Sequence, residues 1–244
     1  MSRAPAVAEA PAPGGRQVIH VVLSRTDGLP RDPLGRHTSP GGLSLLRSAV
    51  QQVRDSGTET TGHGRLLPAP LGGALPGDVR EGCPPPLHFP ARSPDGRWHW
   101  PAAGWYASVS HSGARGAVAL TRGGWVGIDV QHELPRRHAL SRLGSLLGHP
   151  AGRPASIREW AEAEALLKAQ GRAGRRPERL APLPSWHPGW RQTVAGWWIC
   201  SVPLSRSGTQ LALAARHPYP VAAQPFPSDG PPGTVAPGQP EGPA

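Results

Sequence analysis

Proline is distributed unevenly along this chain of 244 residues, and its distribution limits where a packed fold can form. Residues 66–95 contain eight prolines, and residues 217–244 contain nine. Proline lacks a backbone N–H and has a fixed φ, so such segments are poor helix interiors and poor central strands. The sequence therefore predicts unpacked ends at 1–16 and 217–244. It also predicts an irregular excursion over 66–95, which can still carry binding residues.

Strand and helix patterns occupy the remaining segments. The β-branched run at 17–24 indicates a buried first strand, and the apolar spacing at 42–53 predicts an amphipathic helix. A second helix is predicted over 157–170, because Ser156 and Glu159 form a capping box and a glycine follows its last turn. Further strands are expected at 105–109, 116–121, 125–131, 195–204 and 209–216.

The turns near these strands give two further predictions. Ser110-His111-Ser112-Gly113 is expected to turn after the strand at 105–109, and Arg122-Gly123-Gly124 is expected to join the next two strands as a β-hairpin. Side chains alternate along a strand, so the strand after this hairpin has one apolar face. Its other face carries Gly127, Asp129 and Gln131.

The composition is that of a folded protein without a secretion or membrane signal. Apolar residues make up 37% of the chain, and the 32 glycines bring this share to about half, as in ordinary globular proteins, which excludes a wholly disordered protein. No run of 18 apolar residues occurs, and the first residues lack the apolar segment of a signal peptide. Cys83 and Cys200 are too few for a disulfide framework and are interpreted as free thiols. We therefore expect a cytoplasmic protein that does not bind membranes.

The charge of the chain indicates an acidic or phosphate-bearing partner. Lysine and arginine number 26 against 16 acids, a formal net charge of +10, and the only lysine is Lys168. Arginine and lysine serve almost equally on a solvated surface, but a planar guanidinium does not replace a compact, movable ammonium. In a composition so rich in arginine, the single lysine indicates a position where an ammonium is needed, although a single lysine can also stand at a position without a special role.

Three short segments contain the residue types of a phosphate and metal site. In Ser110-His111-Ser112, hydroxyls and an imidazole can surround an anion, although an ordinary hydroxyl-rich turn has the same composition. Asp129 lies in an apolar strand, so it needs a cation unless it is a solvated strand end. Glu164 and Lys168 share one helical stripe, for which a surface ion pair is the alternative. Asp129 and Glu164 together offer the oxygen ligands that Mg²⁺ prefers.

In this order and spacing, the three segments resemble the 4′-phosphopantetheinyl transferases, specifically their larger monomeric type built of two similar halves. That family has a Ser-His-Ser element, then a Gly-Ile/Val-Asp-Val/Ile-Glu strand, then a helix of pattern W-x-x-K-E-A-x-x-K. The corresponding segments here are 110–112 (SHS), 127–131 (GIDVQ) and 160–168 (WAEAEALLK). The resemblance covers about 105–171 by motif and extends by length and element order to 17–216.

The resemblance implies an activity. The chain would transfer 4′-phosphopantetheine from coenzyme A to a serine of an acyl or peptidyl carrier protein and release adenosine 3′,5′-bisphosphate. Asp129, Glu164 and Gln131 would bind Mg²⁺. Glu164 would accept the serine proton, directly or through water, and Lys168 would stabilise or protonate the leaving phosphate.

The resemblance also implies how the two substrates bind. Ser110, His111 and Lys168 would hold a phosphate of coenzyme A, and Arg36 and Arg47 are candidates for contacts to its adenine. Carrier proteins of this kind are acidic, so a chain of net charge +10 would attract them, less strongly as salt increases.

The implied fold is α+β, with two pseudo-equivalent halves, each a small antiparallel sheet with a long helix. The halves would span 17–123 and 124–216 and meet near Arg122–Gly124. Coenzyme A would lie in the cleft between them, and the protein would be a monomer.

The chain departs from the family pattern at two positions. Gln131 stands where the family has glutamate, which weakens the metal site, and Ala163 stands where it has lysine. An arginine from the group at 172, 175 and 176 could replace the lost phosphate contact. These departures leave open a transferase-like scaffold that binds coenzyme A or a carrier protein without turnover.

A third possibility is an arginine-rich protein that binds nucleic acid and stacks bases on some of its nine tryptophans. The sequence disfavours it, because the tryptophans are not interleaved with arginines and several, such as Trp125, Trp197 and Trp198, lie where a core is expected.

Overall fold

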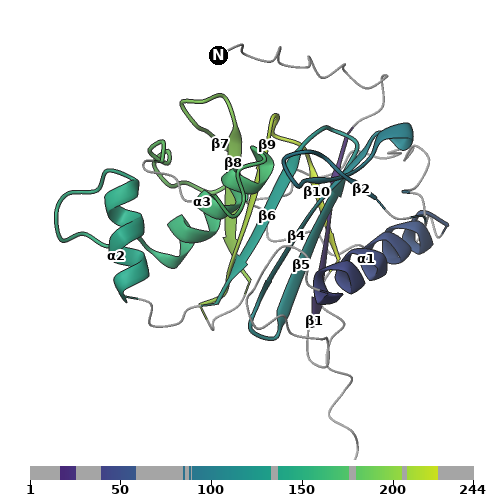
Figure 1. The fold of residues 1–244 in the computed structure, drawn as a ribbon, viewed down its shortest axis with the longest axis horizontal. Helices are drawn as coiled ribbons and strands as arrows, with labels where there is room; N and C mark the ends of the chain where they lie inside the picture. Colours follow the sequence, from purple (N-terminus) through teal and green to yellow (C-terminus); the bar gives the residue numbers. More distant parts are fainter. Residues whose placement is uncertain are drawn as a thin grey trace, which may run out of the picture.

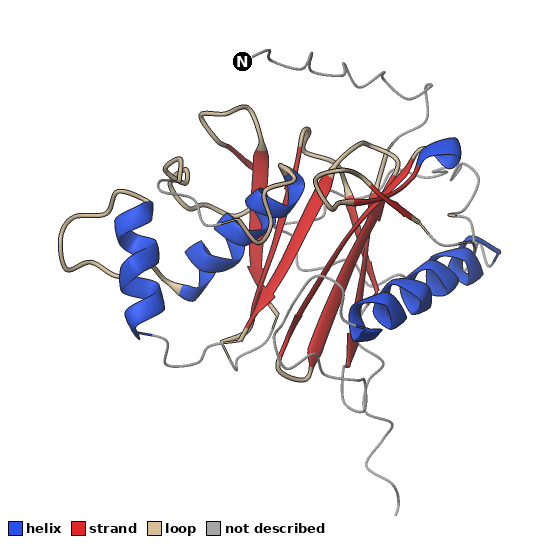
Figure 2. Cartoon of the chain, viewed as in Figure 1, coloured by secondary structure: helices blue, strands red, loops and turns tan. Residues whose placement is uncertain are grey.

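The computed structural model describes residues 17–25, 40–58, 85, 88, 90–132, 137–175, 180–204 and 208–224. Within them the protein has an α+β fold of two β-sheets and three α-helices (Figures 1 and 2). The helices are α1 (Pro40–Thr58), α2 (Arg137–Leu146) and α3 (Ile157–Ala169), with a short 3-10 helix at Pro101–Ala103. The strands are β1 (Ile19–Arg25), β2 (Ala91–Arg92), β3 (Trp98–Trp100), β4 (Trp105–Ser112), β5 (Arg115–Thr121), β6 (Val126–Gln131), β7 (Arg191–Gln192), β8 (Trp198–Pro203), β9 (Gln210–Ala215) and β10 (Val221–Gln224).

The two sheets pack against each other across a shared core, and a helix covers the outer face of each (Figure 1). The first sheet has the strand order β10-β1-β5-β4-β3-β2, and the second has the order β6-β9-β8-β7. Helix α1 packs on the first sheet and α3 on the second, so these two blue helices lie on opposite sides of the red strands in Figure 2. The layers therefore run helix, sheet, sheet, helix.

Alternation of side chains along the strands builds these layers. In β1, Ile19 faces the core between the sheets, whereas Val22 faces α1. In β6, Ile128 lies in the same central core, as do the valines on either side of it, and Gly127 on the opposite face meets α3. The predicted apolar face of β6 is thus confirmed.

The last described strand corrects the expected C-terminal boundary. β10 pairs in parallel with β1, with Val221 opposite Ile19, and Val221 is buried in the central core. Just before it, the Tyr219 hydroxyl donates to the carbonyl oxygen of Gly123 at 2.6 Å. The prediction of an unpacked end is therefore wrong for 217–224, where prolines precede an edge strand, a position that tolerates them. The rest of that segment lies outside the described residues, as do 1–16 and 66–84.

The predicted hairpin across residues 122–124 is wrong, because the chain passes here from one sheet to the other. β5 pairs with β4 on one edge and with β1 on the other, and β6 pairs with β9. Both edges of β5 are thus occupied, which leaves no place for β6 beside it. The sheet change falls where the two halves were expected to meet.

Strand β4 runs further than expected. It continues to Ser112, and the turn consists of Gly113 and Ala114 instead of beginning at residue 110. The reason is its pairing with β5, which extends to Ser112 opposite Arg115.

Three serines at alternate positions of β4 bind the free edge of β6. We call Ser108, Ser110 and Ser112 the serine row. Their Oγ atoms accept the backbone N–H groups of residues 128, 130 and 132 at 3.1, 3.1 and 3.2 Å. The serine row thus supplies hydrogen-bond acceptors to this strand edge, as a neighbouring strand would, and these bonds join the two sheets.

Helix α3 has the ends that the sequence predicts. Ser156 and Glu159 form the capping box, and Gly171 has a φ of 69° just beyond the helix. The helix lies directly on β6, because a Cβ at Gly127 would be 1.9 Å from the carbonyl oxygen of Ala165. Helix α1 is longer than the predicted 42–53. None of the helices in the described part of the chain is long and apolar enough to cross a membrane.

Candidate functional site

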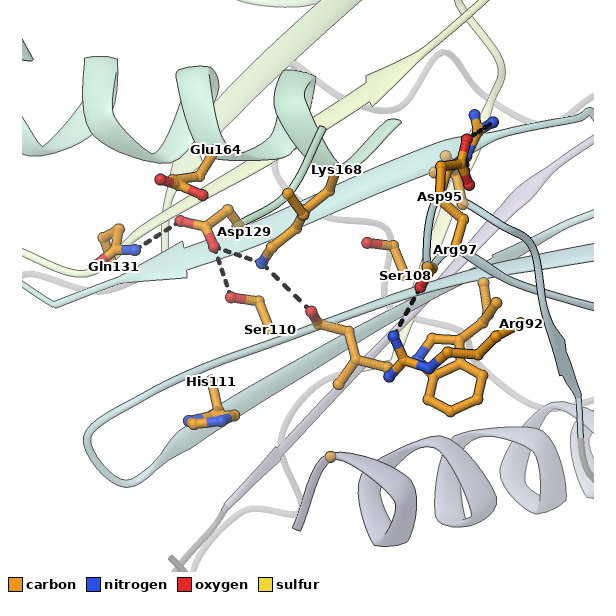
Figure 3. A pocket seen from close by; sticks show the side chains of 17 residues that line it. Arg92, Asp95, Arg97, Ser108, Ser110, His111, Asp129, Gln131, Glu164 and Lys168 are labelled. Atoms are coloured by element: carbon orange, nitrogen blue, oxygen red, sulfur yellow. Dashed lines mark hydrogen bonds and ion pairs between the residues drawn. The ribbon is translucent and has the colours of Figure 1, made fainter. Parts of the chain in front are cut away.

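A cavity of about 380 Å³ lies between elements of the two sheets (Figure 3). β4, β6 and α3 form one side of it, and the hairpin of β2 and β3, together with Gly42 of α1, forms the other. The polar residues that line it are Arg92, Asp95, Arg97, Ser108, Ser110, His111, Asp129, Gln131, Glu164 and Lys168. Six of the residues that the sequence singled out are therefore brought together here, whereas Ser112 does not line the cavity: the six are Ser110, His111, Asp129, Gln131, Glu164 and Lys168.

Asp129 is the centre of the polar contacts at one end of the cavity. It is only 3% exposed, so it is not a solvated strand end. Its Oδ1 accepts hydrogen bonds from Ser110 Oγ and Lys168 Nζ, both at 2.7 Å, and its Oδ2 accepts one from Gln131 Nε2 at 2.7 Å. Lys168 is therefore the cation that a buried carboxylate at this position requires.

The single lysine uses all three of its ammonium protons within the protein. Lys168 Nζ donates to Asp129 Oδ1 and also to the carbonyl oxygens of Ile128 at 3.0 Å and Val109 at 3.3 Å. These acceptors lie on β6 and β4, so the ammonium sits at the junction of the two sheets (Figure 3). The alternative of a plain surface ion pair with Glu164 is wrong, because the partner of Lys168 is Asp129.

Glu164 faces the same end of the cavity from α3. Burial, and then the negative charge of Asp129, raise the pKa of Glu164, while the nearby charge of Lys168 opposes this shift. Within the described residues, no hydrogen bond or ion pair reaches its carboxylate. Glu164 is therefore the acidic group of the site that is available to a ligand.

The three expected metal ligands, Asp129, Glu164 and Gln131, all line this end of the cavity. In the part of the chain that the structure describes, no group of three or more His, Cys, Asp or Glu side chains could hold a metal ion. The set is therefore two carboxylates and one amide, and the amide donates to Asp129.

Ser110 and His111 both line the cavity, but they differ in burial and in hydrogen bonding. The Ser110 hydroxyl is buried; it donates to Asp129 and accepts the N–H of Val130, so its one proton is already in use. His111 is exposed and lines the same cavity. Ser110 thus orients Asp129, and His111 is the freer of the two to meet a ligand.

The hairpin of β2 and β3 carries functional candidates that sequence reasoning missed. Arg92 stacks on Trp98, with Cζ 3.7 Å from the ring centroid, and donates to the Gly96 carbonyl oxygen at 2.7 Å. Burial lowers the pKa of Arg92. A signal was available, since a Pro-Asp-Gly turn before the alternating segment 98–100 is typical of a hairpin. The proline count of 66–95 concealed it.

Several expected cationic contacts are not at the cavity. Arg47, Arg172 and Arg175 are exposed and do not line it, and Ala163 is buried away from it. Arg36 and Arg176 lie outside the described residues. Within the described part of the chain, the cations along the cavity are Arg92, Arg97 and Lys168.

Three of the nine tryptophans, Trp100, Trp105 and Trp197, are buried in the two cores under the helices. They cannot stack on nucleic-acid bases, which weakens the alternative of a nucleic-acid-binding protein.

The cavity thus offers two carboxylates and an ammonium at one end, and guanidinium groups on the opposite hairpin. Such an arrangement suits a ligand with several phosphates whose chemistry occurs at the carboxylate end. No family model matches the chain, and no curated protein sequence matches it.

Proposed function

We propose that the protein transfers the 4′-phosphopantetheine group of coenzyme A to a serine of an acyl or peptidyl carrier protein. One observation carries the proposal. Asp129, Glu164 and Lys168 come from different elements, yet they converge with Ser110 and His111 on one cavity. These are the residue types, in the order and spacing, by which the sequence resembles the phosphopantetheinyl transferases.

The connectivity of the sheets supports the two-half architecture that belongs to this proposal. In the first sheet a strand, a helix and a final antiparallel pair give the order β1-β5-β4. In the second sheet a strand, two helices and a final antiparallel pair give the corresponding order β6-β9-β8. We infer that the halves are pseudo-equivalent and that coenzyme A binds in the cavity between them.

The residues at the carboxylate end fit a magnesium ion. Burial, and then the negative charge of Asp129, raise the pKa of Glu164, so a divalent cation near both carboxylates would relieve their repulsion. Asp129 and Glu164 would hold the ion, with the amide oxygen of Gln131 if that amide turns, and ligand oxygens and water would complete the set. The bound ion would supply charge neutralisation on the pyrophosphate.

Protein side chains would carry out the proton transfer and stabilise the phosphates. The serine oxygen of the carrier protein forms a bond to the β-phosphorus of coenzyme A, and the bond from that phosphorus to the bridging oxygen breaks. Glu164 accepts the serine proton, directly or through water. Lys168 can donate to the departing phosphate by giving up its longest contact, to the Val109 carbonyl oxygen. His111 would contact a phosphate at the exposed side.

The partner would be an acidic carrier protein. A formal net charge of +10 attracts such a protein before contact, and this attraction weakens as salt is added. We expect the monomer to be the active form, because the sequence resembles the monomeric type of the family.

A transfer assay tests the proposal. The purified protein, coenzyme A and Mg²⁺ are incubated with a panel of apo carrier proteins, and intact mass reports the gain of one phosphopantetheine. We expect a gain that falls by about 10²–10⁴-fold in Glu164→Gln and is abolished in Lys168→Ala. Glu159→Gln is the matched control, because it makes the same substitution on the same helix at the capping box, outside the cavity.

The other outcomes separate the alternatives. Binding of coenzyme A without transfer to any carrier would favour a scaffold without turnover and would make Gln131 and Ala163 the first suspects. Salt-sensitive DNA binding without coenzyme A binding would contradict the proposal and favour a nucleic-acid-binding protein.

A further inference from the structure

The side chain of Arg97 contacts three separate parts of the protein. Its Nε donates to Asp95 Oδ1 at 3.0 Å, and its Nη2 pairs with Asp95 Oδ2. Its Nη1 donates to the carbonyl oxygen of Ala169 at 2.8 Å, and its Cζ lies 3.7 Å from the ring centroid of Trp125. Although burial alone would raise the pKa of Asp95, its hydrogen bonds from Arg97 and Ser93 lower it. Arg97 is therefore held by a charged partner within its own hairpin while it contacts α3 and the residue before β6.

The contact to Ala169 completes the C-terminal end of α3. Beyond that end, the N–H of Gly171 donates to the Lys168 carbonyl oxygen at 3.1 Å, and the N–H of Arg172 donates to that of Leu167 at 2.8 Å. This is a Schellman motif, which gives backbone N–H donors to the carbonyl oxygens of residues 167 and 168 but none to that of Ala169. Arg97 supplies the donor for the Ala169 carbonyl, at the negative end of the helix dipole, where a cation is stabilising.

The hairpin and the end of α3 are also in close steric contact. A Cβ at Gly171 would lie 2.2 Å from Asp95 Oδ2 and 3.0 Å from Arg97 Nε. Since Gly171 also has a φ of 69°, this position admits glycine for two reasons. The ion pair of Asp95 and Arg97 therefore packs directly on the turn that ends the helix.

Trp125 connects the same guanidinium to β6. It immediately precedes β6, and its ring packs edge-on against Tyr106 of β4, with centroids 4.7 Å apart. Asp129 lies four residues further along β6, and Lys168 immediately precedes Ala169 in α3. Arg97 thus contacts α3, which carries Lys168, and the residue immediately before β6, the strand that carries Asp129.

We propose that Arg97 is a positioning residue that fixes the end of α3 against the start of β6, so that Lys168 meets Asp129. A planar guanidinium is needed, because one group must hold a carboxylate, donate to a carbonyl and stack on an indole. A lysine could make only some of these three contacts. The effect of Arg97 on catalysis rests on the proposed transferase function, whereas its effect on the end of α3 does not.

Hydrogen exchange at the end of α3 tests the proposal without any substrate. In Arg97→Gln we expect the amides of residues 170, 171 and 172 to exchange about fivefold faster, because one hydrogen bond at this end is lost. The amide of Val118, in the first sheet, should keep its rate. Arg92→Gln is the matched control, since Arg92 also stacks on a tryptophan at 3.7 Å in the same hairpin and donates to the Gly96 carbonyl oxygen within that hairpin.

The outcomes decide the proposal. Unchanged exchange at 170–172 in Arg97→Gln, or equal acceleration in Arg92→Gln, would overturn it. If Arg97→Gln fails to fold, Arg97→Lys is measured by the same criteria, because it keeps the charge and loses the planar geometry.

A kinetic measurement distinguishes positioning from direct binding. If the chain transfers phosphopantetheine, Arg97→Gln should lower kcat by about tenfold to a hundredfold with an unchanged KM for coenzyme A. A raised KM with an unchanged kcat would show that Arg97 binds the ligand instead and would overturn its positioning role. If the wild-type chain transfers nothing, the proposed function fails, and the exchange data alone decide the role of Arg97.

Discussion

Two glutamates that are two residues apart on α3 have opposite surroundings. Side chains two residues apart on a helix point about 200° apart, so Glu162 faces the second sheet and Glu164 faces the cavity. Glu162 is fully buried and is bonded to Arg191, Arg158 and Ser201. Glu164 has a raised pKa and no bonded partner among the described residues. Glu162 therefore anchors the helix, and Glu164 is available to bind a ligand or accept a proton.

This difference predicts that Glu164→Gln stabilises the protein at neutral pH. The pKa of Glu164 is higher in the folded state than its ordinary value of 4.5, so the folded protein favours the protonated form. Below pH 4.5 the group is protonated in both states and has no cost. As the pH rises through the folded pKa, the carboxylate destabilises the fold, and glutamine removes this cost.

Urea unfolding followed by tryptophan fluorescence between pH 4 and 8, without divalent ions, measures the effect. Glu159→Gln should behave in the opposite way. Although burial raises the pKa of Glu159, its hydrogen bonds from Ser156 outweigh this and lower it, so its carboxylate contributes stability at neutral pH. A Glu164→Gln variant that is less stable than wild type at pH 7 and equal at pH 4 would contradict the assignment.

At the scale of elements, the site depends on how closely α3 approaches β6. Gly127→Ala would place a Cβ 1.9 Å from the carbonyl oxygen of Ala165 and 2.7 Å from the Ala169 nitrogen, so the helix must move away. We expect a loss of about 1–3 kcal/mol in the free energy of unfolding, measured by chemical denaturation. Transfer activity should fall as well, because Glu164 and Lys168 move with α3. A variant of wild-type stability would show that the helix can shift without cost.

Local patterns in the sequence predicted the elements that carry the site. The capping box at Ser156, the glycine stop after α3 and the apolar face of β6 each depend on neighbouring residues, and each is confirmed. The pairing of strands is not local. A short turn at 122–124 suggests a hairpin, but whether β5 can accept β6 depends on β1, about one hundred residues earlier in the chain.

The candidate site was predictable to a similar degree. Asp129, Glu164 and Lys168 are recognisable by type and spacing, and they meet at one cavity. The role of Ser110 is not visible in the sequence, because it depends on β6 lying across the serine row. The same holds for Arg97, whose partners on α3 and before β6 are brought to it only by the packing of the two sheets.

At the scale of the whole molecule, the end of the described chain completes the first sheet. A chain that ends at Arg216 lacks β10, whereas one that ends at Gln224 keeps it. We expect the shorter chain to be less stable by about 2–4 kcal/mol, because the burial of Val221 and the hydrogen bond from Tyr219 to Gly123 are lost. Thermal unfolding of the two chains checks this, and equal midpoints would contradict it.

The parallel pairing of β10 with β1 also sets an order of events during synthesis. Ile19 pairs with Val221, so one edge of β1 waits for about 200 further residues before its partner leaves the ribosome. At bacterial or eukaryotic elongation rates this interval is about 10–40 s. During it, an apolar strand edge is open to other nascent chains. Synthesis is therefore a period in which this chain can aggregate through β1, whatever the stability of the finished protein.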